Sequence, residues 1–243
     1  MRYFVVYYDA YHSLMAWESY LGGTVAQILV INPNSSKAVT RSMEACLKLF
    51  AGNGHEILCI ELEDAPAGIE TDAHVAEVVP LLIEAVQGAK ADAVVIACFS
   101  DPGISAVRAA TNVPIVGIAE AAYLTALGLG QRFGIVSMGP SSIDRHRRYL
   151  EDLQLDGRLA GDRSIDMTVA ELIAQNAVIP VTRVASVLRD EDGAEAVILG
   201  CAGLGTYREA LQAELGLPVI DPVQAGVALA CMQAELGYRR RAL

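Results

Sequence analysis

Each half of the 243-residue chain contains an apolar run of strand length that ends at a cysteine. Cys98 lies in VVIACFSDPG, and Cys201 lies in AVILGCAG, 103 positions further along. One such cysteine alone is as often a small buried hydrophobe as a reactive group. Two matched thiols on opposite sides of one carbon could do more, because one thiolate removes a proton while the other thiol delivers one to the opposite face. The pair therefore predicts inversion of a carbon centre by acid–base catalysis.

Nucleophilic catalysis by a single thiolate is the alternative, and it requires an adjacent base. The sequence offers no such partner, because all four histidines lie away from both cysteine motifs: His12, His55, His74 and His146.

The segments around the two cysteines belong to an internal duplication. Three segments of the first half recur in the same order in the second half: ADAVVIACFSDPG as AEAVILGCAG at an offset of 103 residues, VPIVGIAEAA as LPVIDPVQAG at 104, and ILVINPNSS as GIVSMGPSS at 106. Between them, apolar runs of strand length alternate with amphipathic helical stretches, which is the βαβ pattern of a parallel sheet. The duplication predicts an α/β protein of two similar lobes, each a parallel sheet flanked by helices, related by a pseudo-twofold axis.

The repeat also predicts the limits of the lobes. We expect residues 24–119 and 222–243 to form the first lobe and residues 120–221 the second, with the active site in the cleft between them. The aromatic-rich segment 1–23 differs in composition from the rest and is interpreted as an appendage, with a peripheral strand or helix as the alternative.

Each cysteine motif precedes a segment that can start a helix. Ser100 or Asp101 could cap a helix after Cys98, with proline next in its first turn. The segment TYRE after Cys201 has the pattern of a capping box, and Asn34 or Ser35 could cap the helix that follows NPNSS. Helix N-termini carry unpaired N–H groups, so we expect them to bind anions and to lower the pKa of a nearby thiol.

Composition limits the class of protein. The net charge of −11 argues against nucleic acid as a partner, because phosphate demands Lys and Arg. The chain has five widely spaced cysteines, without a CxxC pair or a Cys/His cluster, so neither a zinc site nor a disulfide framework is expected. No segment reads as a membrane span or leader. We expect reduced thiols in the cytoplasm, a small-molecule substrate, no membrane partner and no metal. Three further cysteines lie in apolar patterns and are interpreted as buried: Cys46, Cys59 and Cys231.

The segments INPNSS, ACFSDPG, PIVGIAEAA and LGCAGLG together resemble the aspartate/glutamate racemase superfamily, and specifically its hydantoin racemase branch. The resemblance covers residues 26–237. It implies a two-lobed α/β fold, no cofactor, and inversion at a carbon next to a carbonyl by two catalytic cysteines, here Cys98 and Cys201. Superfamily members commonly associate, so it also implies a homo-oligomer. Glycine often stands in the family where this chain has Ser100, which leaves the shape of that loop open.

The residues beside the cysteines favour one branch of the superfamily. Its amino-acid racemases resemble CNT and GCTH at these places, whereas this chain has CFS and GCAG and so lacks the polar Thr-His pair. A hydantoin C5–H is flanked by a neutral imide carbonyl and is easier to remove than the Cα–H of an amino acid. A less polar pocket, with Phe99 and Ala202 beside the thiols, suits the hydantoin.

Further candidates come from strand ends and cysteine loops. Asn32 could donate to a ring carbonyl or make a local turn, and Glu120 could orient a ring N–H or bond between lobes. Backbone N–H groups after each cysteine could stabilise an enolate oxygen. One of three serines, Ser137, Ser141 and Ser142, is expected in the cleft, whereas the run RHRR at 145–148 is interpreted as a solvated helix face. The predicted substrate-binding residues are Asn32, Phe99, Ser100, Glu120, Ser137, Ala202 and Gly203.

Several functions stay open at this point. The first is a cofactor-independent racemase for 5-substituted hydantoins or for the related ureide allantoin. The second is another reaction through the same carbanion, such as amino-acid racemisation or decarboxylation of a malonate-type acid. The third is a two-lobed module that binds a small molecule without chemistry.

Overall fold

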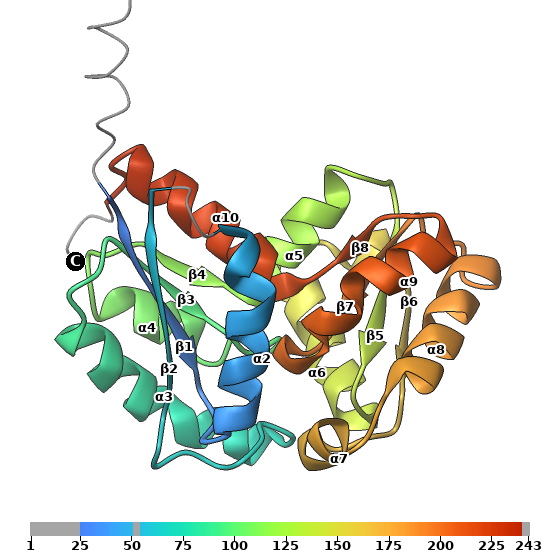
Figure 1. The fold of residues 1–243 in the computed structure, drawn as a ribbon, viewed down its shortest axis with the longest axis horizontal. Helices are drawn as coiled ribbons and strands as arrows, with labels where there is room; N and C mark the ends of the chain where they lie inside the picture. Colours follow the sequence, from blue (N-terminus) through green and yellow to red (C-terminus); the bar gives the residue numbers. More distant parts are fainter. Residues whose placement is uncertain (1–24, 51–53, 240–243) are drawn as a thin grey trace, which may run out of the picture.

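The computed structural model describes residues 25–50 and 54–239, so the segment interpreted above as an appendage lies outside the described residues. Strands and helices alternate along the described chain, as the apolar runs predict (Figure 1). The strands are β1 (Gln27–Asn32), β2 (Glu56–Glu61), β3 (Ala93–Ile96), β4 (Ile115–Gly117), β5 (Phe133–Ser137), β6 (Leu159–Ser164), β7 (Ala196–Leu199) and β8 (Val219–Ile220).

The helices cover both faces of the sheets. The α-helices are α2 (Lys37–Leu47), α3 (Asp72–Gly88), α4 (Ile104–Ala109), α5 (Ile118–Leu127), α6 (Pro140–Asp152), α7 (Val169–Ala174), α8 (Val178–Asp190), α9 (Arg208–Leu215) and α10 (Pro222–Glu235). The 3₁₀ turns are η1 (Lys48–Phe50), η2 (Asp156–Arg158) and η3 (Ala202–Tyr207). Within the described ranges, no helix is both long and apolar enough to cross a membrane.

The two halves of the chain form two sheets of the same topology. The first sheet has the order β2-β1-β3-β4 and the second the order β6-β5-β7-β8, and all neighbouring strands are parallel. The strands β1, β3 and β4 take the places that β5, β7 and β8 take in the second sheet, and these are the segments that recur in the sequence. The prediction of two similar parallel sheets flanked by helices is confirmed.

The helix that follows each sheet's last strand crosses to the other half. Helix α5 follows β4, yet its Tyr123 packs in the core of the second sheet. Helix α10 follows β8, yet its Val227 packs on the first sheet. The two helices contact each other closely, since a Cβ at Gly226 would lie 2.9 Å from Cγ2 of Ile118. This exchange joins the halves near the centre of the molecule in Figure 1. The lobe limits drawn from the repeat stay a prediction.

Three helices start further along the chain than predicted. Ser36 caps α2, because its Oγ accepts the N–H of Val39. Ser35 is not the cap, and the Asn34 side chain accepts the Ser36 N–H outside the helix. Helix α4 starts after Gly103, which has a φ of 60° and makes no side-chain cap. Helix α9 starts at Arg208, because the 3₁₀ turn η3 takes up the residues before it, and the TYRE capping box does not form.

Candidate active site

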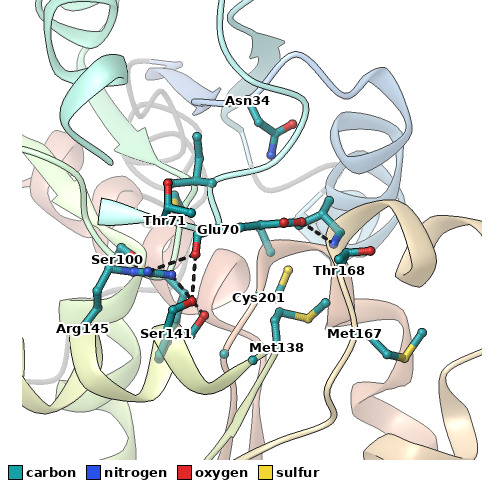
Figure 2. A pocket seen from close by; sticks show the side chains of 18 of the residues that line it. Asn34, Glu70, Thr71, Ser100, Met138, Ser141, Arg145, Met167, Thr168 and Cys201 are labelled. Carbon is teal, nitrogen blue, oxygen red and sulfur yellow. Dashed lines mark hydrogen bonds between the residues drawn. The ribbon is translucent and has the colours of Figure 1, made fainter. Parts of the chain in front are cut away.

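The loops after β3 and β7 bring the two predicted cysteines to one cavity. Cys98 and Cys201 each lie two residues beyond the end of their strand. Both line a cavity of about 470 Å³ to which the two halves contribute residues. Figure 2 shows Cys201 at this cavity. Ligands of parallel α/β sheets bind at the carboxyl ends of the strands, which is where this cavity lies.

Burial dominates the acidity of both thiols. It raises the pKa of Cys98 to about 12 and that of Cys201 to about 11. Backbone N–H groups oppose it: that of Ser100 lowers the pKa of Cys98, and that of Gly203, 3.4 Å from the Cys201 Sγ, lowers the pKa of Cys201. The expectation of a thiol pKa held low by helix N-termini is therefore corrected, because desolvation outweighs these hydrogen bonds. Each thiol is a weak acid, and each thiolate is correspondingly a strong base.

Much of the cavity surface around the thiols is apolar. Phe99 is 3% exposed, and its ring packs edge-on against Tyr123 with 5.6 Å between the centroids. Phe99 and Ala202 thus line the cavity beside the thiols, as the sequence predicts. The apolar lining residues are Val39, Ile69, Ala97, Phe99, Met138, Met167, Val169 and Ala202.

Helix α6 brings a cation, Arg145, to the cavity, although its charged run is typical of a solvated helix face. Arg145 is only 8% exposed and lines the cavity, so the interpretation of residues 145–148 as a solvated face is wrong for its first two residues. The guanidinium of Arg145 donates to the Glu70 carbonyl at 3.2 Å and to the Ser142 Oγ at 3.1 Å, with Ser100 Oγ at 3.4 Å (Figure 2). These protein acceptors hold it in place.

His146, the second residue of that run, also lines the cavity. Its ring meets the Phe99 ring edge-on at 4.9 Å, so the statement that all histidines lie away from the cysteine motifs holds in sequence but not in space. Its Nδ1 lies 2.9 Å from Asp162 Oδ2 and 3.1 Å from Ser137 Oγ. Ser137 is fully buried in this cluster and does not line the cavity. Its role in the structure is to hold His146.

Three other predicted residues are also absent from the cavity lining. Asn32 is fully buried, and its amide donates to Asn34 Oδ1 at 3.0 Å and to Thr40 Oγ1 at 3.2 Å. Asn34 lines the cavity instead, with its amide nitrogen directed into it (Figure 2). Glu120 is held in an ion pair with Arg108, on α4. Gly203 acts through its N–H on Cys201, as described above.

Ser100, Ser141 and Ser142 do line the cavity, together with polar residues that were not among the predicted ones: Glu70, Thr71, Asp166, Thr168 and Glu171. A signal existed for the last two, because TVAE has the capping-box pattern and Thr168 and Glu171 form that box at the start of α7. No local pattern marks Glu70, which lies in the loop between β2 and α3.

Comparison with known proteins identifies the family. The model of the Asp/Glu/Hydantoin racemase family matches residues 28–230, and the chain belongs to this family. It is 38% identical to the hydantoin racemase of Paenarthrobacter aurescens over 223 residues, which cover 88% of this chain and 93% of that protein. The structure of the allantoin racemase from Klebsiella pneumoniae superimposes with a TM-score of 0.85 at 32% identity, covering 89% of this chain and 90% of that one.

A glutamate racemase from Francisella tularensis has a TM-score of 0.64 at 16% identity, covering 89% of this chain and 84% of that one, and it shows the shared fold alone. The chain has the Asp/Glu racemase fold, and it is a racemase, an isomerase.

Proposed function

We propose that this racemase inverts C5 of 5-substituted hydantoins, with Cys98 and Cys201 as its catalytic acid–base pair. The observation that carries the proposal is the presence of both thiols at one largely apolar cavity, on equivalent loops of the two halves. A single acid–base residue could exchange a proton on one face only, whereas inversion requires a base on one face and an acid on the other.

The reaction balances with these two groups alone. The thiolate of one cysteine takes the C5 proton, and the electron pair moves onto the C4 carbonyl oxygen as an enolate. The thiol of the other cysteine then gives its proton to the opposite face of C5. The product is the opposite enantiomer, with the first cysteine now a thiol and the second a thiolate. Backbone N–H groups after each cysteine, those of Phe99 and Ala202, would donate to the enolate oxygen.

The polar groups of the cavity favour a neutral ring over an amino acid. Arg145 is the one arginine among the described residues that line the cavity. It already donates to three protein oxygens, which leaves it poorly available to a substrate carboxylate. The segment GCAG lacks the Thr-His pair of the amino-acid racemases beside Cys201. Asn34 supplies an amide that could donate to a ring carbonyl. Allantoin, a hydantoin with a ureido group at C5, is the second candidate because of the likeness to the Klebsiella enzyme.

A substrate panel tests this assignment. We expect enantiopure hydantoins with alkyl or benzyl groups at C5 to lose optical rotation with a kcat/KM at least about a hundredfold above that for L-aspartate or L-glutamate. The assay is run without added metal, with allantoin in parallel, and spontaneous racemisation is subtracted using the Cys98→Ser/Cys201→Ser double variant. Rapid turnover of the two amino acids without turnover of the hydantoins would contradict the assignment.

The raised thiol pKa values predict the pH dependence. Proton abstraction needs a thiolate, and a raised pKa lowers the thiolate fraction at neutral pH. We therefore expect kcat/KM to increase from pH 6 to pH 9, by up to about tenfold per unit, without a plateau below pH 9. Initial rates of racemisation measure this, and circular dichroism in the same buffers checks that the fold is unchanged. A maximum below pH 8 would mean that one thiol is far more acidic than its burial implies.

A further inference from the structure

The loop between β2 and α3, which both belong to the first half, reaches the second half. Its residues Ile69, Glu70 and Thr71 line the cavity. The Glu70 carbonyl accepts hydrogen bonds from Ser141 Oγ at 2.8 Å and from Arg145 Nη1 at 3.2 Å, both on α6. Figure 2 shows these bonds converging on Glu70 from the second half of the molecule.

The side chain of Glu70 makes a separate contact with α7. Its Oε1 accepts the backbone N–H of Val169, the first residue of α7, at 2.9 Å. The two loops pack tightly here, since a Cβ at Gly68 would lie 3.1 Å from the Cβ of Val169. Glu70 itself is held on its own side, because its N–H donates to His74 Nδ1 at 3.3 Å. The Glu70 carboxylate, which belongs to the first half, thus accepts a hydrogen bond from the main chain of the second half.

This contact lies away from the junction of the halves. In Figure 1 the helices α5 and α10 meet near the centre, between the two halves, whereas α7 approaches the start of α3 at the bottom of the molecule. The Cys98 loop belongs to the first sheet and the Cys201 loop to the second. Helix α2 of the first half also packs on η3, which follows Cys201 directly. The relative position of the two cysteine loops is therefore set by the α5–α10 junction, by the α2–η3 contact and, beside α7, by Glu70.

We propose that Glu70 is a positioning residue that clasps α7 through the Val169 N–H and thereby holds the two thiols in line across the substrate. The proposal rests on the two-cysteine racemisation proposed above. It predicts a loss in the chemical step, because a small displacement of one acid–base group relative to the other lowers the rate far more than it weakens binding.

Two substitutions remove the clasp from opposite ends. Glu70→Ala removes the acceptor, whereas Glu70→Gln keeps an amide oxygen at the same place and removes only the charge. Val169→Pro removes the donor, and the backbone accepts proline because position 169 is the first of its helix and Thr168 before it is extended, with φ −80° and ψ 163°. Proline also keeps the Cβ that packs against Gly68.

The expected result is a fall in kcat of about 10- to 100-fold for Glu70→Ala and for Val169→Pro, with KM within about threefold of the wild type. Glu70→Gln is expected to stay within about threefold of the wild type in both constants, and the Glu70→Ala/Val169→Pro double variant to be no worse than the weaker single variant. An equal loss in Glu70→Gln and Glu70→Ala, or additive losses in the double variant, would overturn the clasp.

A measurement without substrate separates the clasp from the proposed reaction. Alkylation of Cys98 and Cys201 by iodoacetamide, followed site by site by mass spectrometry, is expected to be at least about fivefold faster in Glu70→Ala than in Glu70→Gln, because α7 is then no longer held by the Glu70 side chain and the cavity opens. Equal alkylation rates in the two variants would contradict the proposed role of Glu70, even if the wild type racemises hydantoins. Faster alkylation in a protein that inverts no hydantoin would support the clasp and remove the proposed function.

Discussion

Cys98→Ser and Cys201→Ser are each expected to slow inversion of a 5-substituted hydantoin by at least about a thousandfold. A serine hydroxyl is a far weaker acid than even these buried thiols, so the variant lacks either the base or the acid that inversion needs. The fold should tolerate the change, because serine is close to cysteine in size and both side chains line the cavity. Polarimetry with each enantiomer as the starting material measures the loss.

One of the two cysteines remains in each single variant. It can still take the C5 proton of the enantiomer that presents this proton to it, and return a deuteron from D₂O to the same face. We therefore expect each variant to exchange the C5 proton of one enantiomer without inverting it, and the two variants to prefer opposite enantiomers. Proton NMR of the recovered substrate detects the exchange.

Cys59→Ser is the matched control, because Cys59 lies on β2 and outside the cavity lining. It is expected to keep the wild-type rate. The two-base proposal fails if Cys98→Ser and Cys201→Ser both racemise normally. It also fails if both exchange the same enantiomer, since the thiols would then serve one face of C5.

The fold could be predicted from the sequence because its signals are local and repeated. The strand β3 has four fully buried residues, AVVI, and its counterpart β7 has AVIL, so both appear as short apolar runs at matching places. Hydrophobic burial on both faces of a parallel strand produces such a run whatever lies around it. The starts of α2, α4 and α9 differ from the predicted starts. The cap of a helix depends on which polar group reaches which N–H, and tertiary contacts decide this.

The site could be predicted only where its residues adjoin the strand ends. Cys98, Phe99, Cys201 and Ala202 follow directly from strands, and the structure brings all four to the cavity. Arg145 reaches the cavity from a helix whose charged run resembles a solvated face. Spacing was the available signal, because Arg145 and His146 lie four residues before Tyr149 and Leu150, on one side of α6. Glu70 and Asn34 depend on the path of loops, which no local pattern encodes.

In each half an aspartate caps the helix that packs on the other half, and a glycine leaves room for the carboxylate. The positions of the aspartate and the glycine are exchanged between the two halves. In the first half the buried Asp101 accepts the N–H groups of Ala119 at 3.0 Å and Glu120 at 2.9 Å, at the start of α5. Gly117 leaves room for it, since a Cβ there would lie 2.3 Å from the Asp101 carboxyl carbon. In the second half Asp221 itself caps α10, and Gly205 leaves the room.

Position 117 corresponds to Asp221 in the repeat, at the offset of 104 residues. The backbone is nearly the same at both, with φ −85° and ψ 136° at Gly117 and φ −81° and ψ 116° at Asp221. Asp101 has a φ of 41°, a left-handed value that glycine adopts without strain. An aspartate at 117 with a glycine at 101 would therefore place a carboxylate at the start of α5 and leave room for it, as Asp221 and Gly205 do at the start of α10.

Asp101→Gly is expected to lower the free energy of unfolding by about 2–4 kcal/mol, because it leaves buried N–H groups and the Tyr149 hydroxyl, 3.2 Å from the carboxylate, without their acceptor. Gly117→Asp should cost at least as much, because it sets a second carboxylate against the first in the same space. The double variant Asp101→Gly/Gly117→Asp is expected to recover about half or more of the lost free energy of unfolding. The new aspartate would stand at the N-cap position of α5 itself. Thermal and urea unfolding followed by circular dichroism compare the four proteins. A double variant as unstable as the sum of the single variants would show that the two halves do not share one interchangeable cap.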